Sequence, residues 1–342
     1  MSELELLSRK LPYVYGQPKL QGVIRQSAED FIVEEDLGFE PDGEGHHVLL
    51  FIEKRDTNTQ WLAKQLARYA DLPNKEIGYA GLKDRHAVTR QWFSVHMAGR
   101  DIDWQGFNSE NWKILNITRH QRKLRPGYLK GNRFQITVRH VTGEAAELEQ
   151  RLSLIKQQGI ANYYGEQRFG FDNLRRAYDW LAGNLKIKKK SEKSILLSSL
   201  RSAIFNQLLA ERLRNSCWDQ AMPGDVLMLT GSHSVFVADE VDDTINLRLA
   251  QRDVLTTAPL FGKGNNLAQA QALAFEEQLL QQLPILCRQL NQAGLTMQRR
   301  ALICMPEGLT WQRDEHAQSL VLRFYLPSGA YATSLLREIV DY

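Results

Sequence analysis

The chain has 342 residues and a mass of 39.3 kDa, which exceeds one ordinary domain of about 150 residues and predicts two domains. Hydrophobic residues make up 43% of the sequence and charged residues 24%, which excludes an intrinsically disordered chain. The formal net charge is only +3, so a polyanionic partner would have to bind to local basic segments. The sequence contains no run of 18 apolar residues and therefore predicts no transmembrane helix.

The first 158 residues show mainly strand patterns. Asp42-Gly43 is a hairpin turn signal and predicts that the first two strands pair with each other. Thr57 or Asn58 can cap a helix that follows the second strand. A second helix is expected to begin near Glu144 and to end at Gly159. Strands are expected over residues 24–35, 47–52, 76–81, 92–97 and 134–140.

Helical periodicity dominates after Gly159, apart from a short strand that begins near 223–225. Strand alternation returns over 320–326, and a final helix places apolar residues on one stripe over 332–340. One late strand and one late helix cannot form a domain by themselves, so we expect them to complete the N-terminal sheet. The sequence therefore predicts one domain made of residues 1–158 and 305–342, with residues 159–304 inserted as a second domain.

Charge is distributed unevenly along the chain. Residues 29–44 contain eight acidic residues and no Lys or Arg, whereas residues 113–133 contain seven Lys or Arg and no acidic residue. Because aromatic residues lie within and beside the basic segment 113–133, we interpret it as a nucleic-acid contact surface. A second basic run, 186–193, fits an RNA contact and a solvated surface equally well.

The N-terminus and the cysteines favour the cytoplasm. Residues 1–5 are acidic and lack the apolar core of a signal peptide, so we do not expect secretion. Cys217, Cys287 and Cys304 are far apart and odd in number, which excludes a disulfide framework and a CxxC zinc site. The sequence also lacks GxGxxG, GxxxxGK[ST], HExxH and GxSxG motifs, so we expect side-chain chemistry without a metal.

One segment, residues 79–91, combines basic side chains with a single carboxylate. Lys83, Arg85 and Arg90 surround Asp84 in the sequence, and nearby cations lower the pKa of a carboxyl group. An Asp that stays ionised suits a nucleophile or a base better than a general acid. The alternative is an Asp that caps a turn and pairs with a surface Arg, and the residues alone leave both interpretations open.

Five separated motifs resemble those of the TruD family of tRNA pseudouridine synthases, and the resemblance extends over nearly the whole chain. The segment around Asp84 is similar to the active-site motif of that family. The motifs are 29–35 (EDFIVEE) with 43–47 (GEGHH), 80–89 (AGLKDRHAVT), 130–134 (KGNRF), 162–170 (NYYGEQRFG), and 326–333 (LPSGAYAT) with 336–338 (LRE).

The resemblance implies an α+β fold, the pseudouridine synthase fold, with a mixed, mainly antiparallel sheet and an inserted family-specific α+β domain. It implies isomerisation of uridine to pseudouridine without a cofactor. Asp84 would be the catalytic residue, either by attack on C1′ or by removal of a 2′ proton. The implied substrate is tRNA, with uridine 13 of the D-arm as target, and we expect a monomer with no membrane and no obligate protein partner.

Four residues are expected around the target nucleotide, which must leave its base stack to react. Phe134 would stack on the base, although it also begins the core-facing row of its strand. Asn132 would bind the uracil edge or serve only as a turn residue. Phe31 would contact the base or belong to the core. Tyr331 occupies a position where other family members carry Phe, so it adds a hydroxyl.

Basic residues complete the expected site. Arg337 resembles the residue that pairs with the catalytic Asp; the alternative is an exposed helical Arg that pairs with Asp341. The expected RNA-binding residues are Lys83, Arg85, Arg122, Lys123, Arg125, Lys130 and Arg168. Two other functions stay open on the residues alone: an Asp-dependent, metal-assisted nuclease or glycosidase, and a non-catalytic module that binds or folds tRNA.

Overall fold

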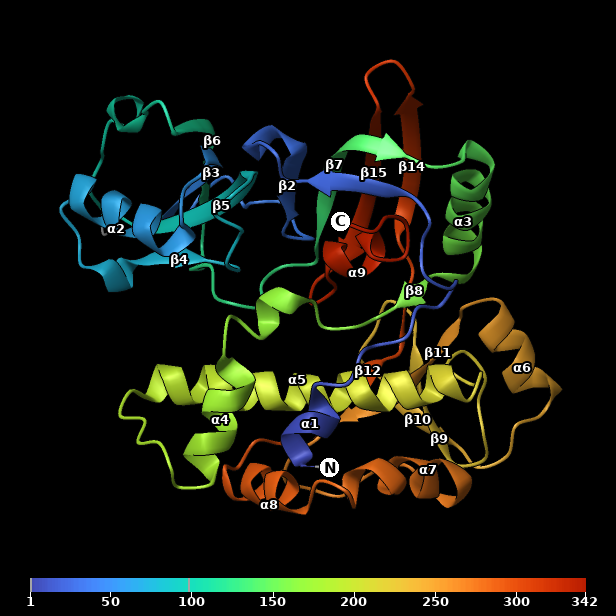
Figure 1. Ribbon diagram of the computed structural model, residues 1–342. Coiled ribbons are helices and arrows are strands. Elements are labelled where there is room, and N and C mark those ends of the chain that lie inside the picture. Colours follow the sequence, from blue (N-terminus) through green and yellow to red (C-terminus); the bar gives the residue numbers. More distant parts are fainter. Residues whose placement is uncertain (1, 98) are drawn as a thin grey trace. The chain divides into compact units, whose positions relative to one another are not determined.

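The structure is a computed structural model that describes residues 2–97 and 99–342, and it divides into two compact units (Figure 1). Unit 1 comprises residues 1–18, 157–305 and 330–339. Unit 2 comprises residues 19–156, 306–329 and 340–342. Each unit is therefore built from three separate segments of the chain.

Unit 2 is built on one mixed, mainly antiparallel sheet. Among the described residues the sheet has nine strands; seven follow the order β14-β15-β7-β2-β5-β3-β6, while β1 pairs with β7 and β4 with β5. The pair β2–β5 is parallel. The strands are β1 (Gln21–Ile24), β2 (Phe31–Asp36), β3 (His47–Arg55), β4 (Ile77–Tyr79), β5 (Val88–His96), β6 (Trp112–His120), β7 (Gly131–Thr142), β14 (Glu307–Asp314) and β15 (Ser319–Pro327).

Two longer helices accompany this sheet, α2 (Thr59–Tyr69) and α3 (Ala145–Gln158). Asn58 is the N-cap of α2, as predicted, because its side chain accepts hydrogen bonds from the backbone of the first turn. Gly159 directly follows α3 with a φ of +84°, a conformation that glycine adopts without strain. The predicted end of this helix is therefore confirmed.

The late strand β15 pairs with β7 from Leu320 opposite Val138 to Pro327 opposite Gly131. This pairing confirms that the strand predicted at 320–326 completes the N-terminal sheet. In β7, Ile136 and Val138 of the predicted apolar row are fully buried, but Thr137 between them is also buried and Phe134 is half-buried, so the predicted alternation holds only in part. Periodicity could reveal these strands because each has one apolar face to bury.

The hairpin predicted at Asp42-Gly43 is wrong. β2 pairs with β5 and β7, whereas β3 pairs with β5 and β6, so β5 lies between the two strands that the turn was expected to join. A turn signal reports a local change of chain direction, but strand partners are chosen by the packing of the whole sheet.

Unit 1 is organised around α5 (Lys190–Arg214), a helix of 25 residues whose side chains supply much of the core of the unit. A four-stranded sheet with the order β10-β9-β11-β12 and the pair β8–β13 accompany it. The other elements are α1 (Glu3–Leu7), β8 (Ile160–Ala161), α4 (Asn173–Leu181), β9 (Asp225–Leu229), β10 (Val235–Ala238), α6 (Asp243–Ala250), β11 (Val254–Leu260), α7 (Ala270–Leu280), α8 (Pro284–Gln292), β12 (Gln298–Ala301), β13 (Ile303–Cys304) and α9 (Ala332–Leu336).

Residues 1–18 and 330–339 belong to unit 1, whereas the sequence assigned both segments to the N-terminal domain. The fully buried Glu338 carboxylate explains part of this difference, because its Oε2 accepts the N–H groups of Val14 (3.0 Å) and Tyr15 (3.3 Å). Ser334 of α9 donates a hydrogen bond to the Tyr163 carbonyl at 2.9 Å. The boundaries at 156/157 and 305/306 lie close to the expected ones.

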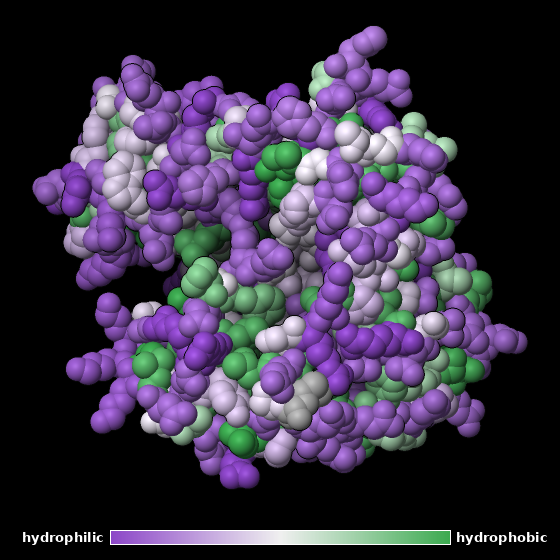
Figure 2. Space-filling model, in the orientation of Figure 1, coloured by the Kyte–Doolittle hydropathy of each residue, from purple (hydrophilic) through white to green (hydrophobic). Residues whose placement is uncertain are grey.

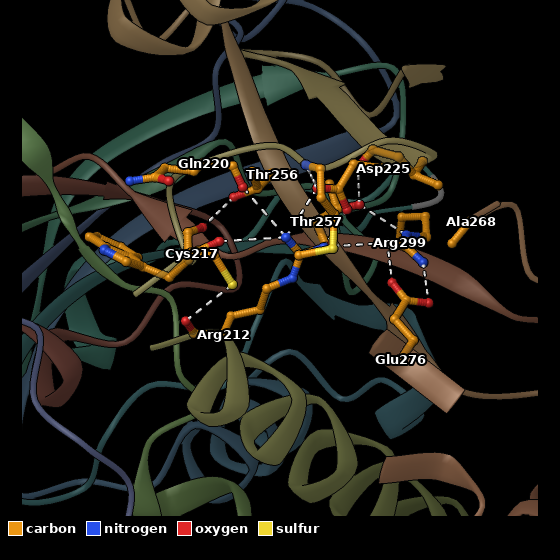
Figure 3. A network of polar contacts seen from close by, with 12 residues as sticks. Arg212, Cys217, Gln220, Asp225, Thr256, Thr257, Ala268, Glu276 and Arg299 are labelled. Atoms are coloured by element: carbon orange, nitrogen blue, oxygen red, sulfur yellow. Dashed lines mark hydrogen bonds and ion pairs between the residues drawn. The ribbon is translucent and has the colours of Figure 1, made fainter. Parts of the chain in front are cut away.

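A buried polar network holds the sheet of unit 1 to its helices (Figure 3). Arg212 of α5 pairs with Asp225 of β9, and the two side chains are 2% and 0% exposed. Arg299 of β12 contacts Glu276 of α7 at 2.7 Å and donates to the Thr257 carbonyl of β11 at 2.9 Å. Burial of paired charges strongly penalises any rearrangement that separates the partners.

The face of the molecule drawn in Figure 2 is mainly hydrophilic. Figure 2 shows hydrophilic side chains over most of the visible face, with smaller hydrophobic areas between them. Within the part of the chain that the structure describes, no helix combines the length and the apolar character needed to cross a membrane.

Candidate active site

The motif segment forms the loop between β4 and β5 in unit 2. Because Tyr79 of β4 pairs with Phe93 of β5, the loop leaves and re-enters the same sheet. Asp84 lies near the middle of the loop, and its side chain is 25% exposed. The carboxylate is therefore accessible to a substrate, although most of its surface is covered.

Arg25 forms an ion pair with Asp84 within unit 2. Its Nη2 donates to Asp84 Oδ2 at 3.0 Å, and its guanidinium carbon lies 4.4 Å from the centre of the Phe31 ring. Arg25 has a φ of +59°, the left-handed region that non-glycine residues seldom occupy. Sequence reasoning missed Arg25 because it lies outside the recognised motifs, and its position six residues before Phe31 carried no periodic signal.

Two of the cations expected around Asp84, Lys83 and Arg90, have other partners. Lys83 Nζ contacts Glu35 Oε1 at 2.8 Å, and both side chains are almost fully buried. Arg90 Nε contacts Glu53 at 2.8 Å, and the guanidinium also contacts Glu34 at 3.1 Å. Lys83 thus ties the loop to β2 and is not presented to an RNA phosphate, contrary to expectation. The acidic residues of β2 and β3 compete successfully for these cations because the sheet places them closer.

Buried side chains fix the backbone of the loop. Gln91 donates to the Gly81 carbonyl at 3.0 Å and accepts from the Thr59 hydroxyl at 2.9 Å. The same hydroxyl oxygen accepts the N–H of Lys83 at 3.1 Å. Gln91 and Thr59 are both fully buried, so water does not compete for these bonds. The loop that carries Asp84 is therefore anchored to β5 and to the first turn of α2.

The side chain of Lys54, in β3, contacts the same loop. Its Nζ donates to the Thr57 carbonyl at 2.7 Å and lies 3.4 Å from the Asp84 carbonyl. The side chain is fully buried, and this desolvation lowers the pKa of Lys54 to about 8. The Asp84 charge opposes the shift and Lys83 adds to it.

Aromatic rings from three strands lie beside the ion pair. The Phe31 ring, only 2% exposed, meets the Phe134 ring edge to face at a centroid distance of 6.2 Å. Phe134 stacks on Phe324 of β15 at 5.2 Å. Arg25 thus links Asp84 to the aromatic row that contains two of the four expected nucleotide contacts.

Asn132 lies two residues before Phe134 in β7, so both side chains project from the same face of the strand. Its Oδ1 is buried, and no hydrogen-bond partner for it is found among the described residues. A free amide oxygen is costly inside a protein and is available to a ligand donor. Gly131 is required at the preceding position, because a Cβ there would lie 2.3 Å from the Tyr325 ring.

Tyr331 and Arg337 belong to unit 1. The Tyr331 ring packs against Tyr164 at 5.8 Å, and burial raises the pKa of its hydroxyl. Arg337 donates to the Leu11 carbonyl at 2.9 Å and lies over the Tyr13 ring at 4.4 Å. These contacts tie the last helix to the N-terminal segment, and the expected pairing of Arg337 with Asp84 stays a prediction.

The expected RNA-binding residues differ in accessibility. Arg85, Arg122, Arg125 and Lys130 are exposed in unit 2. Lys123, by contrast, donates to the Lys75 carbonyl. In unit 1, Arg168 is bound by the hydroxyl groups of Ser198 and Ser202. In the described ranges, no group of three or more His, Cys, Asp or Glu side chains could hold a metal ion.

Comparison with known proteins gives consistent matches. The chain matches the family described as tRNA pseudouridine synthase D (TruD) over residues 9–193 and 171–339. The tRNA pseudouridine synthase D of Pseudoalteromonas atlantica is 41% identical over 337 residues, covering 96% of this chain and 95% of the relative. The corresponding protein of Aeromonas hydrophila is 42% identical over 337 residues, with coverages of 97% and 94%.

The fold matches as well. The crystal structure of the putative tRNA pseudouridine synthase D from Methanosarcina mazei superimposes with a TM-score of 0.74 at 22% identity, over 99% of this chain and 98% of that one. Fold and sequence together define an isomerase of the pseudouridine synthase class. Within that class, the chain belongs to the TruD family of tRNA pseudouridine synthases.

Proposed function

We propose that this protein converts a uridine of tRNA to pseudouridine, with the Asp84 carboxylate as the reacting group and without a metal or organic cofactor. The target implied by the family resemblance is uridine 13 in the D-arm. The observation that carries the proposal is the ion pair of Asp84 with Arg25 beside Phe31. A charge-assisted hydrogen bond from a guanidinium is strong and directional, so Arg25 would fix the orientation of the Asp84 carboxylate.

The reaction is a balanced isomerisation. The bond between N1 and C1′ breaks, the base turns, C5 bonds to C1′, C5 loses its proton and N1 gains one. Asp84 can assist by attack on C1′, which gives a covalent sugar intermediate, or by removal of a 2′ proton, which gives a glycal. Both routes place the carboxylate at the sugar, and the loop anchored by Gln91 and Thr59 would hold it there.

The flipped base would be recognised by β7. Asn132 can accept the N3–H of uracil with Oδ1, the buried oxygen that lacks a partner among the described residues. Phe134 is half-buried and supported by Phe324, so we assign base stacking to Phe134. Phe31 is too buried to offer a full ring face and would instead support Arg25 and Phe134. Tyr331 and Arg337 stay predictions as further site residues.

The test is chemical mapping of pseudouridine in tRNA incubated with the pure protein in EDTA. We expect modification at one uridine, its loss in Asp84→Asn, and unchanged tRNA affinity of that variant. Asp101→Asn is a matched control, because Asp101 is 96% exposed in the same unit, and it should leave the rate unchanged. An inactive wild-type protein that still binds tRNA would indicate a non-catalytic module. Activity lost in EDTA and restored by one divalent ion, with folded tRNA, would contradict the absence of a cofactor.

A further inference from the structure

Lys54 is an unusual residue for its position. It lies in β3 with 0% exposure, and a lysine seldom occupies a fully buried site. A methionine would fill a comparable volume without the cost of removing an ammonium group from water. The choice of lysine therefore calls for a reason beyond packing, and the contacts of Nζ provide one.

Those contacts join two segments at the site. Nζ donates to the Thr57 carbonyl at 2.7 Å, in the turn before α2, and lies 3.4 Å from the Asp84 carbonyl. The neighbours of Lys54 across the sheet are Thr89 of β5 and Trp112 of β6, which are uncharged. The ammonium group thus contacts the backbone carbonyl of Asp84, the residue proposed to react with the substrate.

We propose that Lys54 is a positioning residue: its buried ammonium group holds the Asp84 carbonyl and thereby fixes where the Asp84 carboxylate meets the sugar. This inference rests on the proposed role of Asp84. A small displacement of a reacting group is sufficient to slow a reaction about 100-fold, so the backbone contact need not touch substrate to matter.

The proposal has a pH signature. Burial lowers the pKa of Lys54 to about 8 from an ordinary value of 10.5, while the Asp84 charge opposes the shift and Lys83 adds to it. The ammonium form should therefore hold the loop below about pH 8 and be lost as the pH rises. The free energy of unfolding should change in the opposite direction to the hold on the loop. Between the pKa of Lys54 in the folded chain and its ordinary value, the unfolded chain keeps a proton that the folded chain has lost. The contribution of Lys54 to the free energy of unfolding therefore increases as the pH rises through this range.

The experiment measures single-turnover pseudouridine formation at saturating tRNA across the neutral and alkaline range. The wild-type rate should fall with a midpoint near pH 8. Lys54→Arg should show no fall there, because a guanidinium stays charged. Lys54→Met should be about 100-fold slower with no such fall and unchanged tRNA affinity. Lys64→Met, at an exposed position in α2, is the matched control and should behave as wild type.

Two results would overturn the inference. One is a wild-type rate and pH profile in Lys54→Met. The other is the same alkaline fall in wild type and Lys54→Arg, which would assign the titration to another group such as the uracil. If Lys54→Met does not fold, the comparison of wild type with Lys54→Arg decides. A wild-type protein that makes no pseudouridine would instead contradict the proposed function.

Discussion

At the scale of single residues, the site depends on contacts between positions far apart in the sequence. Asp84 pairs with Arg25, a residue 59 positions earlier, and Lys83 of the same motif is buried against Glu35. The sequence could nominate Asp84 because the carboxylate stands alone in a motif. It could not assign the partners of Lys83 and Arg90, because these cations pair with carboxylates that the sheet brings close to them.

Arg25→Ala should slow single-turnover pseudouridine formation by about 10- to 100-fold, since a hydrogen bond to a charged group contributes about 1.5–3 kcal/mol. Arg25→Lys should recover part of the rate, because it keeps the charge but not the planar guanidinium over Phe31. Arg100→Ala, at an exposed position of the same unit, is the control. A wild-type rate in Arg25→Ala would show that Asp84 needs no such partner.

At the scale of elements, α2, α3 and β15 could be predicted, but the partners of the strands could not, and the strands β6, β10, β11 and β12 were not expected from the sequence. The helix cap at Asn58 and the end of α3 at Gly159 follow from local chemistry. The hairpin at Asp42-Gly43 failed because β5, from much later in the chain, takes the place beside β2. Local signals describe one segment, whereas the order of strands depends on all of them.

Asn58→Ala should lower the free energy of unfolding of the protein by about 1 kcal/mol, because two N–H groups of α2 lose their acceptor. Asn58→Asp should retain stability, since a carboxylate also accepts these bonds and is favoured at a helix N-terminus. Urea denaturation of the three proteins measures the difference. Equal destabilisation by Ala and Asp would argue against capping as the cause.

The ion pair between α5 and β9 should matter more than any surface pair. Asp225→Asn leaves Arg212 charged and buried, so we expect a loss of about 3–5 kcal/mol in the free energy of unfolding. The double variant Arg212→Met/Asp225→Leu should be more stable than the single one, because no buried charge remains. Asp239→Asn, at an exposed position of unit 1, should be nearly neutral. A nearly neutral Asp225→Asn would contradict this account of the network.

At the scale of the whole molecule, the sequence located where the chain leaves and returns to the large sheet, within a few residues of the observed boundaries. It misassigned residues 1–18 and 330–339, because their attachment depends on tertiary contacts of Glu338 and Ser334 that no periodic pattern reveals. The family motifs could still be recognised, because they do not depend on which unit a segment joins.

The exposed Arg122 and Arg125 should contribute to tRNA affinity through their charge. Replacing both with Ala should weaken binding and flatten the salt dependence of the binding constant by about one unit per residue. Single-turnover chemistry at saturating tRNA should change less. The control replaces Lys263 and Arg288, two exposed cations of unit 1. Equal salt slopes in both double variants would show that 122–125 is merely solvated surface.

The central claim is that Asp84 performs the isomerisation, and release of tritium from tRNA labelled at C5 of uridine tests it most directly. The C5 proton leaves only when C5 has bonded to C1′, so the label reports completed chemistry and not binding. We predict stoichiometric release by the wild-type protein and no release above background by Asp84→Asn at saturating tRNA. Release by Asp84→Asn at a rate close to wild type would contradict the claim.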